Sequence, residues 1–236
     1  MKHYVLVHGA WEGSWSWDET RPSLEAEGHK VTTVDLPGSP GNPQPIAQVT
    51  MKSYVQTVVK TLDQLDHKVI LVGHSMAGAV ISQVAEQRPE KIERLVYVAA
   101  FLLESGDSVL EAMQRDPNGE FFPELVLAED NSYATATEQT WRGKAFHDVA
   151  EARILKALPL VDVGQSTEPF LAKVDVSAEN FGSVPKTYIR TSIDKMVSPS
   201  LQEEMIGNWE VEKVSELVSG HFPTLSSAEK LAEAML

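Results

Sequence analysis

The segment from Lys68 to Ala79 restricts the fold of this chain more than any other. Its sequence, KVILVGHSMAGA, is an apolar, β-branched run followed by a glycine, a serine and small residues that begin a helical pattern. Such a run predicts a buried strand, a sharp turn and a helix, with Ser75 at the apex of the turn. The small neighbours let strand and helix approach closely, as a strained nucleophile elbow requires. We therefore expect Ser75 to hold its hydroxyl clear of its own backbone, as the nucleophile of a serine hydrolase does.

Strand-like and helix-like segments alternate along most of the chain. The expected strands are His3–Val7, Lys30–Asp35, Val69–Gly73, Leu95–Ala99, Lys186–Thr191 and Val211–Leu217. Helical patterns lie near Trp15–Glu27, Met51–Leu65 and Met76–Arg88, and later helices are expected after the Ser198-Pro199 pair and after a capping-box pattern at Ser226–Glu229. The alternation predicts a single α/β domain over residues 1–236, with a mostly parallel central sheet and helices on both faces.

Residues 102–181 interrupt this alternation. The segment contains four prolines, several aromatic residues and a helical pattern at Ala145–Leu158, but no buried parallel strand. We expect a largely helical insertion between two strands, forming a cap (or lid) over the strand ends where catalytic loops gather. The alternative is a helical appendage with a small core of its own.

A serine hydroxyl is a weak nucleophile, and it needs a histidine to take its proton and a carboxylate to orient that histidine. After a nucleophile elbow the chain order is serine, acid, histidine. Only two histidines follow Ser75. His221 lies in a loop between an expected strand and the last helix, whereas His147 lies inside the insertion and is expected at the surface or in the cap. His221 is therefore the predicted base.

The acid of the triad must also follow a strand. Asp194 comes just after the expected strand Lys186–Thr191 and before a capped helix, which makes it the predicted acid. Its rivals are Glu104 and Asp107, which follow another strand. Asp35 precedes the serine, and its neighbours are typical of a turn.

The negative oxygen of a tetrahedral intermediate needs hydrogen-bond donors. We expect one from the backbone N–H of Met76, the residue after the nucleophile, and one from the N–H of Ala10, in the loop after the first strand. His8 and His74 flank these two loops, and we expect them to hold loop geometry without titrating in the reaction.

The elbow departs from its usual pattern at one position. A glycine usually stands at the fifth place of the motif, where this chain has Ala77 followed by Gly78. The extra methyl group fits if the local φ is negative or if the turn opens slightly. Gly73 and Gly78 also have the spacing of a phosphate-binding loop, but the Lys and Ser/Thr of that loop are missing.

Together these motifs resemble the α/β-hydrolase superfamily over nearly the whole chain. The matching segments are closest to a branch of plant hydroxynitrile lyases, plant methyl esterases and bacterial carboxylesterases: His8-Gly9-Ala10-Trp11 with Trp15-Ser16-Trp17, Gly73-His74-Ser75-Met76, Asp194-Lys195 and Gly220-His221. The lyases of this branch carry a threonine after the first-strand histidine and a lysine after the catalytic histidine. Gly9 and Phe222 stand at those places here, so the resemblance implies an esterase. A lyase and a non-catalytic ligand-binding homologue remain the alternatives.

Aromatic residues gather near the predicted loops and the insertion. They suit an apolar cleft for an uncharged acyl or aromatic ester, although most of them could instead fill the core of the insertion. The residues expected to line the substrate site are Gly9, Trp11, Phe101, Trp141 and Phe222.

The composition excludes several other classes of function. The net charge is −14, and residues 101–180 carry 15 Asp/Glu against 6 Lys/Arg, so nucleic acid and anionic membranes are poor partners. There is no cysteine, and the histidines lack paired ligand spacing, so neither metal nor cofactor is expected. The N-terminus lacks a secretory pattern, which favours the cytoplasm. The expected partner is a small-molecule ester, and a homodimer is left open.

Overall fold

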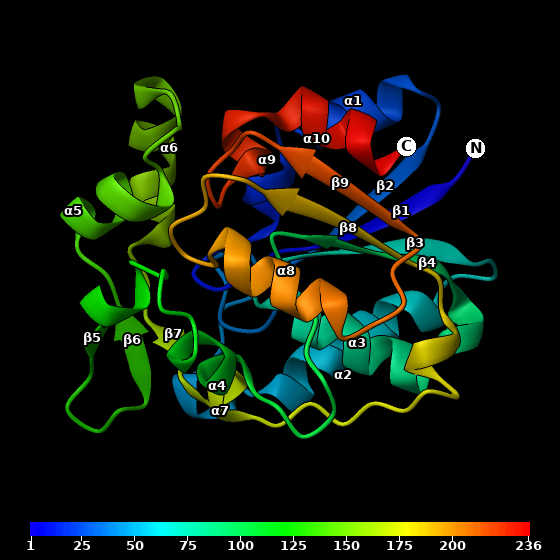
Figure 1. Cartoon of the computed structure of the whole chain (residues 1–236), viewed down its shortest axis with the longest axis horizontal. Helices are drawn as coiled ribbons and strands as arrows, with labels where there is room; N and C mark the ends of the chain where they lie inside the picture. Colours follow the sequence, from blue (N-terminus) through cyan, green and yellow to red (C-terminus); the bar gives the residue numbers. More distant parts are fainter.

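The computed structural model describes all of residues 1–236, and a six-stranded parallel sheet forms its centre (Figure 1). The strands lie in the order β2-β1-β3-β4-β8-β9. Their bounds are β1 His3–Val7, β2 Lys30–Val34, β3 Val69–His74, β4 Ile92–Val98, β8 Lys186–Thr191 and β9 Lys213–Leu217. The six predicted strands and the parallel sheet are confirmed, and the bounds differ from those predicted by three residues at most.

Helices cover both faces of this sheet, as predicted (Figure 1). One face carries α1 Arg21–Ala26 and α10 Ala228–Met235, and the other carries α2 Met51–Asp63, α3 Ala77–Gln87 and α8 Pro199–Gly207, while α9 Pro223–Ser226 directly precedes α10. Tyr4 and Leu6 of β1 pack in the first layer, and Val5 and Val7 pack in the second. Because neighbouring side chains of a strand point to opposite faces, a strand covered on both sides must be apolar throughout. This requirement explains the uninterrupted apolar run of β3.

The helix starts show where local sequence patterns succeed and fail. Ser198 caps α8 as predicted, because its side chain accepts a hydrogen bond from the N–H of Leu201. The predicted capping box before the last helix is wrong: Ser227 makes no capping bond, and the Ser226 hydroxyl contacts Ser219 instead. The predicted helix over Trp15–Glu27 is also wrong as one unit, since a turn separates a 3₁₀ segment from α1.

The chain between β4 and β8 is less helical than predicted. It contains α4 Val109–Gln114, α5 Glu138–Thr140, α6 Glu151–Val161 and α7 Glu168–Leu171, together with an antiparallel sheet of β5 Val126–Leu127, β6 Tyr133–Thr135 and β7 Gln165–Ser166. Strands of two or three residues are too short to give a periodic pattern, so the sequence did not indicate this sheet. The predicted helix at Ala145–Leu158 is wrong in its start, because a π-helical turn at Trp141–Ala145 ends there and α6 begins six residues later.

Short 3₁₀ segments complete the structure. They lie at Ser14–Trp17, Ile46–Gln48, Pro89–Lys91, Phe122–Glu124 and Phe181–Ser183. None of the helices combines the length and the apolar character that crossing a bilayer would need.

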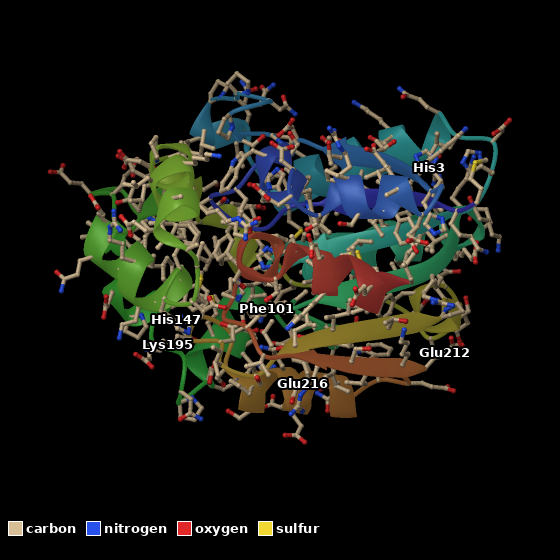
Figure 2. All side chains as sticks on the ribbon, turned by 90° about the horizontal axis from the view of Figure 1, so that it is seen from above. His3, Phe101, His147, Lys195, Glu212 and Glu216 are labelled. Atoms are coloured by element: carbon tan, nitrogen blue, oxygen red, sulfur yellow. The ribbon has the colours of Figure 1, made fainter.

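The carboxyl ends of the parallel strands meet at one edge of the sheet. Figure 2 shows His3, which begins β1, toward the right of the molecule, and Lys195, which follows β8, toward the left. In folds of this kind the loops after the carboxyl ends form the binding site. The residues singled out in the sequence lie in these loops.

Candidate active site

The turn after β3 is strained and tightly held. Ser75 has a φ of +54°, in the left-handed region that residues other than glycine rarely occupy. Its N–H donates to the carbonyl of Val98 at 3.1 Å, and its own carbonyl accepts from the N–H groups of Gly78 and Phe101 at 3.0 Å. These three bonds offset the strain and fix the direction of the serine side chain.

Glycines at two positions make this close turn feasible. A Cβ at Gly73 would lie 2.8 Å from the carbonyl oxygen of Ala77, and a Cβ at Gly78 would lie 2.5 Å from that of Phe101. Ala77 begins α3 and has a negative φ, so its methyl group meets the condition set by the sequence. The motif usually has its glycine at position 77, whereas this structure needs a glycine at position 78, where α3 passes close to the backbone of Phe101.

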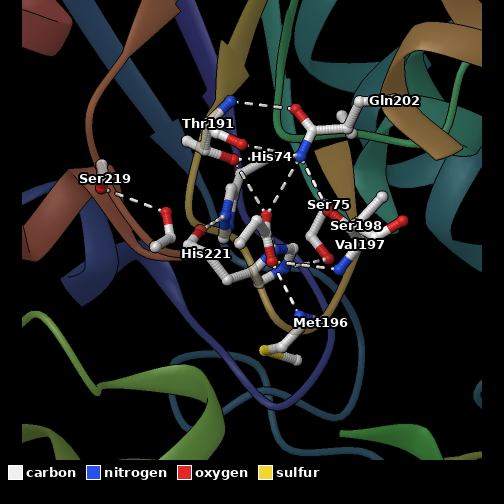
Figure 3. Close-up of polar contacts among 12 residues, drawn as sticks. His74, Ser75, Thr191, Met196, Val197, Ser198, Gln202, Ser219 and His221 are labelled. Atoms are coloured by element: carbon white, nitrogen blue, oxygen red, sulfur yellow. Dashed lines mark hydrogen bonds and ion pairs between the residues drawn. The ribbon is translucent and has the colours of Figure 1, made fainter. Parts of the chain in front are cut away.

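Three side chains form one hydrogen-bonded chain at the sheet edge (Figure 3). The His221 Nε2 lies 2.8 Å from the Ser75 Oγ, and the His221 Nδ1 lies 2.7 Å from the Asp194 Oδ2. A carboxylate only accepts, so Nδ1 carries the proton and Nε2 accepts from the serine hydroxyl. All three residues are buried, at 5% exposure or less. The loops after β3, β8 and β9 thus bring together the three residues that the sequence singled out.

The carboxylate of Asp194 is held from several directions. Its Oδ1 accepts from the N–H groups of Met196 and Val197, at 2.8 and 3.0 Å. Its Oδ2 accepts from Thr191 Oγ1 at 2.9 Å and from Gln202 Nε2 at 3.3 Å, besides the imidazole. These donors stabilise the ionised carboxylate and fix its plane. Sequence reasoning missed Gln202, which had no signal beyond its place in the first turns of α8.

The rival residues lie in other surroundings. Glu104 is exposed, and Asp107 forms an ion pair with Arg115. His147 is half-buried and lies near the loop of His221, since its Cε1 would be 2.7 Å from a Cβ at Gly220. Its Nδ1, however, bonds to the backbone carbonyl of Lys144. None of the three makes a hydrogen bond to the serine, the acid or the histidine of the hydrogen-bonded chain.

Two backbone donors near Ser75 have no acceptor within the chain. The N–H groups of Ala10 and Met76, both buried, make no hydrogen bond to protein. The next amide, that of Trp11, donates to Gln165 Oε1 at 3.0 Å, and Trp11 has a φ of +60°. A β7 side chain therefore fixes the loop that carries the Ala10 amide.

His8 holds the same loop through hydrogen bonds of both ring nitrogens. Its Nε2 accepts from the N–H of Leu36 at 3.0 Å, so its Nδ1 carries the proton and donates to the carbonyl of Gly9 at 2.8 Å. Burial lowers the pKa of His8, which keeps the ring neutral. Its contacts agree with the expectation that His8 holds the loop without titrating.

The aromatic residues expected at the substrate site are buried. Trp141 lies 5.9 Å from Trp11 and 6.4 Å from Phe222, measured between ring centroids, and Phe222 lies 5.5 Å from the ring of His221. Phe101 contributes its backbone to the serine turn. An apolar cavity of about 200 Å³ lies in the 102–181 segment and includes Phe170, whose ring contacts Trp11. None of the four aromatic residues expected at the substrate site lines that cavity.

The 102–181 segment also touches the histidine loop directly. The Asp148 Oδ2 accepts from the N–H of Gly220 at 2.7 Å and from the Ser219 hydroxyl at 3.2 Å. A Cβ at Gly220 would lie 2.5 Å from the Asp148 Oδ1 and would displace this carboxylate. Sequence reasoning missed Asp148, because it is 71 residues from its partner Ser219.

Known proteins share this arrangement of elements. The sequence model described as the alpha/beta hydrolase family matches residues 4–234. An alpha-hydroxynitrile lyase of Arabidopsis thaliana is 33% identical, over 99% of this chain and 95% of the relative. A putative chloroplastic methylesterase 11 of the same plant is 34% identical, over 99% of this chain and 63% of the relative. The crystal structure of polyneuridine aldehyde esterase superposes with a TM-score of 0.87 at 26% identity, covering 100% of this chain and 98% of the other.

Proposed function

Because this chain belongs to the alpha/beta hydrolase family, we propose that it hydrolyses small to medium, mostly apolar carboxylic esters, with Ser75, His221 and Asp194 as its catalytic triad. The observation that carries the proposal is the continuous hydrogen-bonded chain from the serine hydroxyl through the imidazole to the carboxylate, at 2.8 and 2.7 Å. The relatives named as a putative methylesterase and as polyneuridine aldehyde esterase support the same class of reaction.

The proposed reaction follows from the positions of the donors and acceptors. The Ser75 Oγ attacks the ester carbonyl carbon while His221 Nε2 takes the hydroxyl proton. The imidazolium then gives that proton to the departing alkoxy oxygen, which leaves an acyl-serine and a free alcohol. Water, deprotonated by the same nitrogen, then attacks the acyl carbon. The imidazolium returns this proton to the Ser75 Oγ as the acyl–oxygen bond breaks, which releases the carboxylic acid and the free serine. Asp194 stabilises the imidazolium throughout.

The free amides of Ala10 and Met76 would stabilise the tetrahedral oxyanion. Both N–H groups lack an acceptor in the chain, which is what an oxyanion hole requires before substrate binds. Loss of one such donor typically costs about 2.7–4 kcal/mol in the barrier.

We extend the proposal to residues 102–181 as the cap of the active site. Two bonds support this role: the Trp11 N–H donates to Gln165 of β7, and the Trp11 Nε1 donates to the carbonyl of Ala134 in β6 at 3.0 Å. The cap sheet thus holds the loop that carries the Ala10 amide. Trp11, Trp141 and Phe222 would give the bound ester an apolar surface.

The lyase relative makes cyanohydrin cleavage the second candidate. The lyases of the branch that this chain resembles carry a threonine at the place of Gly9, where this structure has no room for such a side chain. A Cβ at Gly9 would lie 2.5 Å from the Glu12 Oε1 and 2.8 Å from the Ser75 Cβ. The lysine of the lyases is replaced by Phe222, which cannot stabilise cyanide. Ester hydrolysis is therefore the better supported function.

The test is a panel of esters that differ in acyl and alcohol size, assayed beside mandelonitrile. We expect turnover of p-nitrophenyl esters and none of the cyanohydrin. Cleavage of mandelonitrile without ester hydrolysis would favour the lyase, and a stable ligand complex without turnover would favour a non-catalytic binding protein.

Replacing His221 by alanine should abolish labelling of the serine by a fluorophosphonate probe, because no base remains to take the hydroxyl proton. Labelling is measured by mass spectrometry of the modified peptide. His147→Ala is the matched control, since it removes the other histidine downstream of the serine and should leave labelling intact. Unchanged labelling of His221→Ala would contradict its role as the base.

Replacing Gly9 by alanine should destabilise the protein by about 1–3 kcal/mol and lower its esterase activity, since the new methyl group collides with Glu12 and Ser75. Gly207→Ala is the control, because a Cβ there meets nothing within 4 Å. Urea unfolding and p-nitrophenyl acetate hydrolysis measure the two effects. Equal stability of the two variants would show that position 9 is not crowded.

A further inference from the structure

A second acid–histidine pair lies beside the proposed triad. The Glu12 Oε1 is 2.7 Å from the His74 Nδ1, and the two side chains are only 1% and 0% exposed. The other ring nitrogen, Nε2, is 2.7 Å from the backbone carbonyl oxygen of His221. The reaction proposed above uses neither side chain.

The partners of His74 determine where its protons lie. A carbonyl oxygen only accepts, so the Nε2 of His74 must carry a proton. Burial would by itself lower the pKa of His74, but the carboxylate of Glu12 and its hydrogen bond outweigh burial and raise it. Burial would likewise raise the pKa of Glu12, and the charge on His74 and their shared bond lower it instead. These contacts and directions favour an imidazolium paired with a carboxylate, in which both ring nitrogens carry a proton.

Keeping this pair has visible structural costs. The second carboxylate oxygen of Glu12, Oε2, is buried and has no hydrogen-bond partner. Such an orphaned acceptor is destabilising and rare in folded proteins. Position 9 must also remain glycine, because Glu12 Oε1 would lie 2.5 Å from any Cβ there. A pair that only added stability would be better replaced by apolar side chains.

The place of His74 in the chain explains what the pair achieves. His74 ends β3 and directly precedes Ser75, whereas His221 lies in the loop after β9. The bond from His74 Nε2 to the His221 carbonyl therefore ties the backbone of the base to the turn of the nucleophile. Phe222 packs its ring on His74 at 5.3 Å, which limits movement of that ring.

We propose that Glu12 and His74 are positioning residues that hold the backbone of His221 at the distance its imidazole needs to reach Ser75. Glu12 orients the ring of His74 and keeps its Nε2 protonated, and His74 fixes the carbonyl of the base. This inference rests on the proposed esterase function.

Kinetics of Glu12→Leu and His74→Leu test the pair. Each variant should lower kcat for p-nitrophenyl acetate roughly 10- to 100-fold, the cost of misplacing a catalytic group, and leave KM within twofold. The double variant should lose no more than the worse single variant, because the two residues act as one unit. Glu12→Gln should recover part of kcat, since its amide can donate to Nδ1 and keep the proton on Nε2. Thermal unfolding verifies that each variant is folded.

The outcomes separate this inference from the function on which it depends. If the wild-type protein hydrolyses no ester, the proposed function fails. If the wild type is active and folded Glu12→Leu keeps its kcat, the positioning pair fails alone. Imidazole ¹⁵N shifts of the wild-type protein give a test that needs no folded Leu variant: we expect a protonated Nε2 on His74, and an unprotonated one overturns the inference.

Discussion

Replacing Ser75 by alanine is expected to lower ester hydrolysis by roughly 10⁴- to 10⁶-fold while leaving the fold intact. The variant retains the turn but has no oxygen to form the acyl intermediate. The methyl group of alanine occupies the place of the serine Cβ, so the three backbone bonds that hold the turn remain. The rate of p-nitrophenyl acetate hydrolysis measures the loss, after subtraction of the spontaneous rate.

A second serine supplies the matched control. Ser82 lies on α3, is fully buried, and bonds to the Gly78 carbonyl and the Tyr97 hydroxyl at 2.8 Å. Ser82→Ala should keep esterase activity near the wild-type value and lose about 1–3 kcal/mol of stability, because the buried Tyr97 hydroxyl is left without its partner. Full activity in Ser75→Ala would place the nucleophile elsewhere and remove the basis of the proposed function.

Replacing Asp194 by asparagine is expected to lower kcat by roughly 10⁴-fold, the loss that the same change causes in serine proteases. An amide NH₂ facing His221 Nδ1 favours the tautomer with its proton on Nε2. That nitrogen then cannot accept the proton of Ser75. Substrate contacts are unaffected, so KM should change little in steady-state kinetics.

Asp107→Asn is the appropriate control for this variant. Asp107 was the rival candidate in the sequence, and it pairs with Arg115 away from the triad. Its variant should retain near wild-type kcat. If Asp107→Asn lost as much activity as Asp194→Asn, the assignment of Asp194 as the acid of the triad would fail.

Sequence reasoning located the catalytic candidates because each lies immediately after a strand with a clear pattern. The apolar run of β3 and the glycine beside it defined the serine turn, and chain order then selected Asp194 and His221. Local patterns were enough at these three points, because parallel strands bring their carboxyl ends to one edge whatever their spacing in the chain.

The supporting residues could not be predicted in this way. Glu12 is 62 residues from His74, and Asp148 is 72 residues from Gly220, so each contact depends on packing that no local pattern encodes. The sheet of β5, β6 and β7 was missed for a different reason, since strands of two or three residues are too short to show a repeating pattern. The cytoplasmic location and the homodimer stay predictions from the sequence.

The bond between Asp148 and Gly220 has a consequence for how substrate enters. Asp148, which bonds to the loop of His221, belongs to the proposed cap. Any outward movement of the cap at that point would therefore pull on the backbone next to His221. Entry of an ester and alignment of the His221 imidazole with Ser75 would then depend on each other. The proposed base would then be aligned with Ser75 only while the cap is closed over the site.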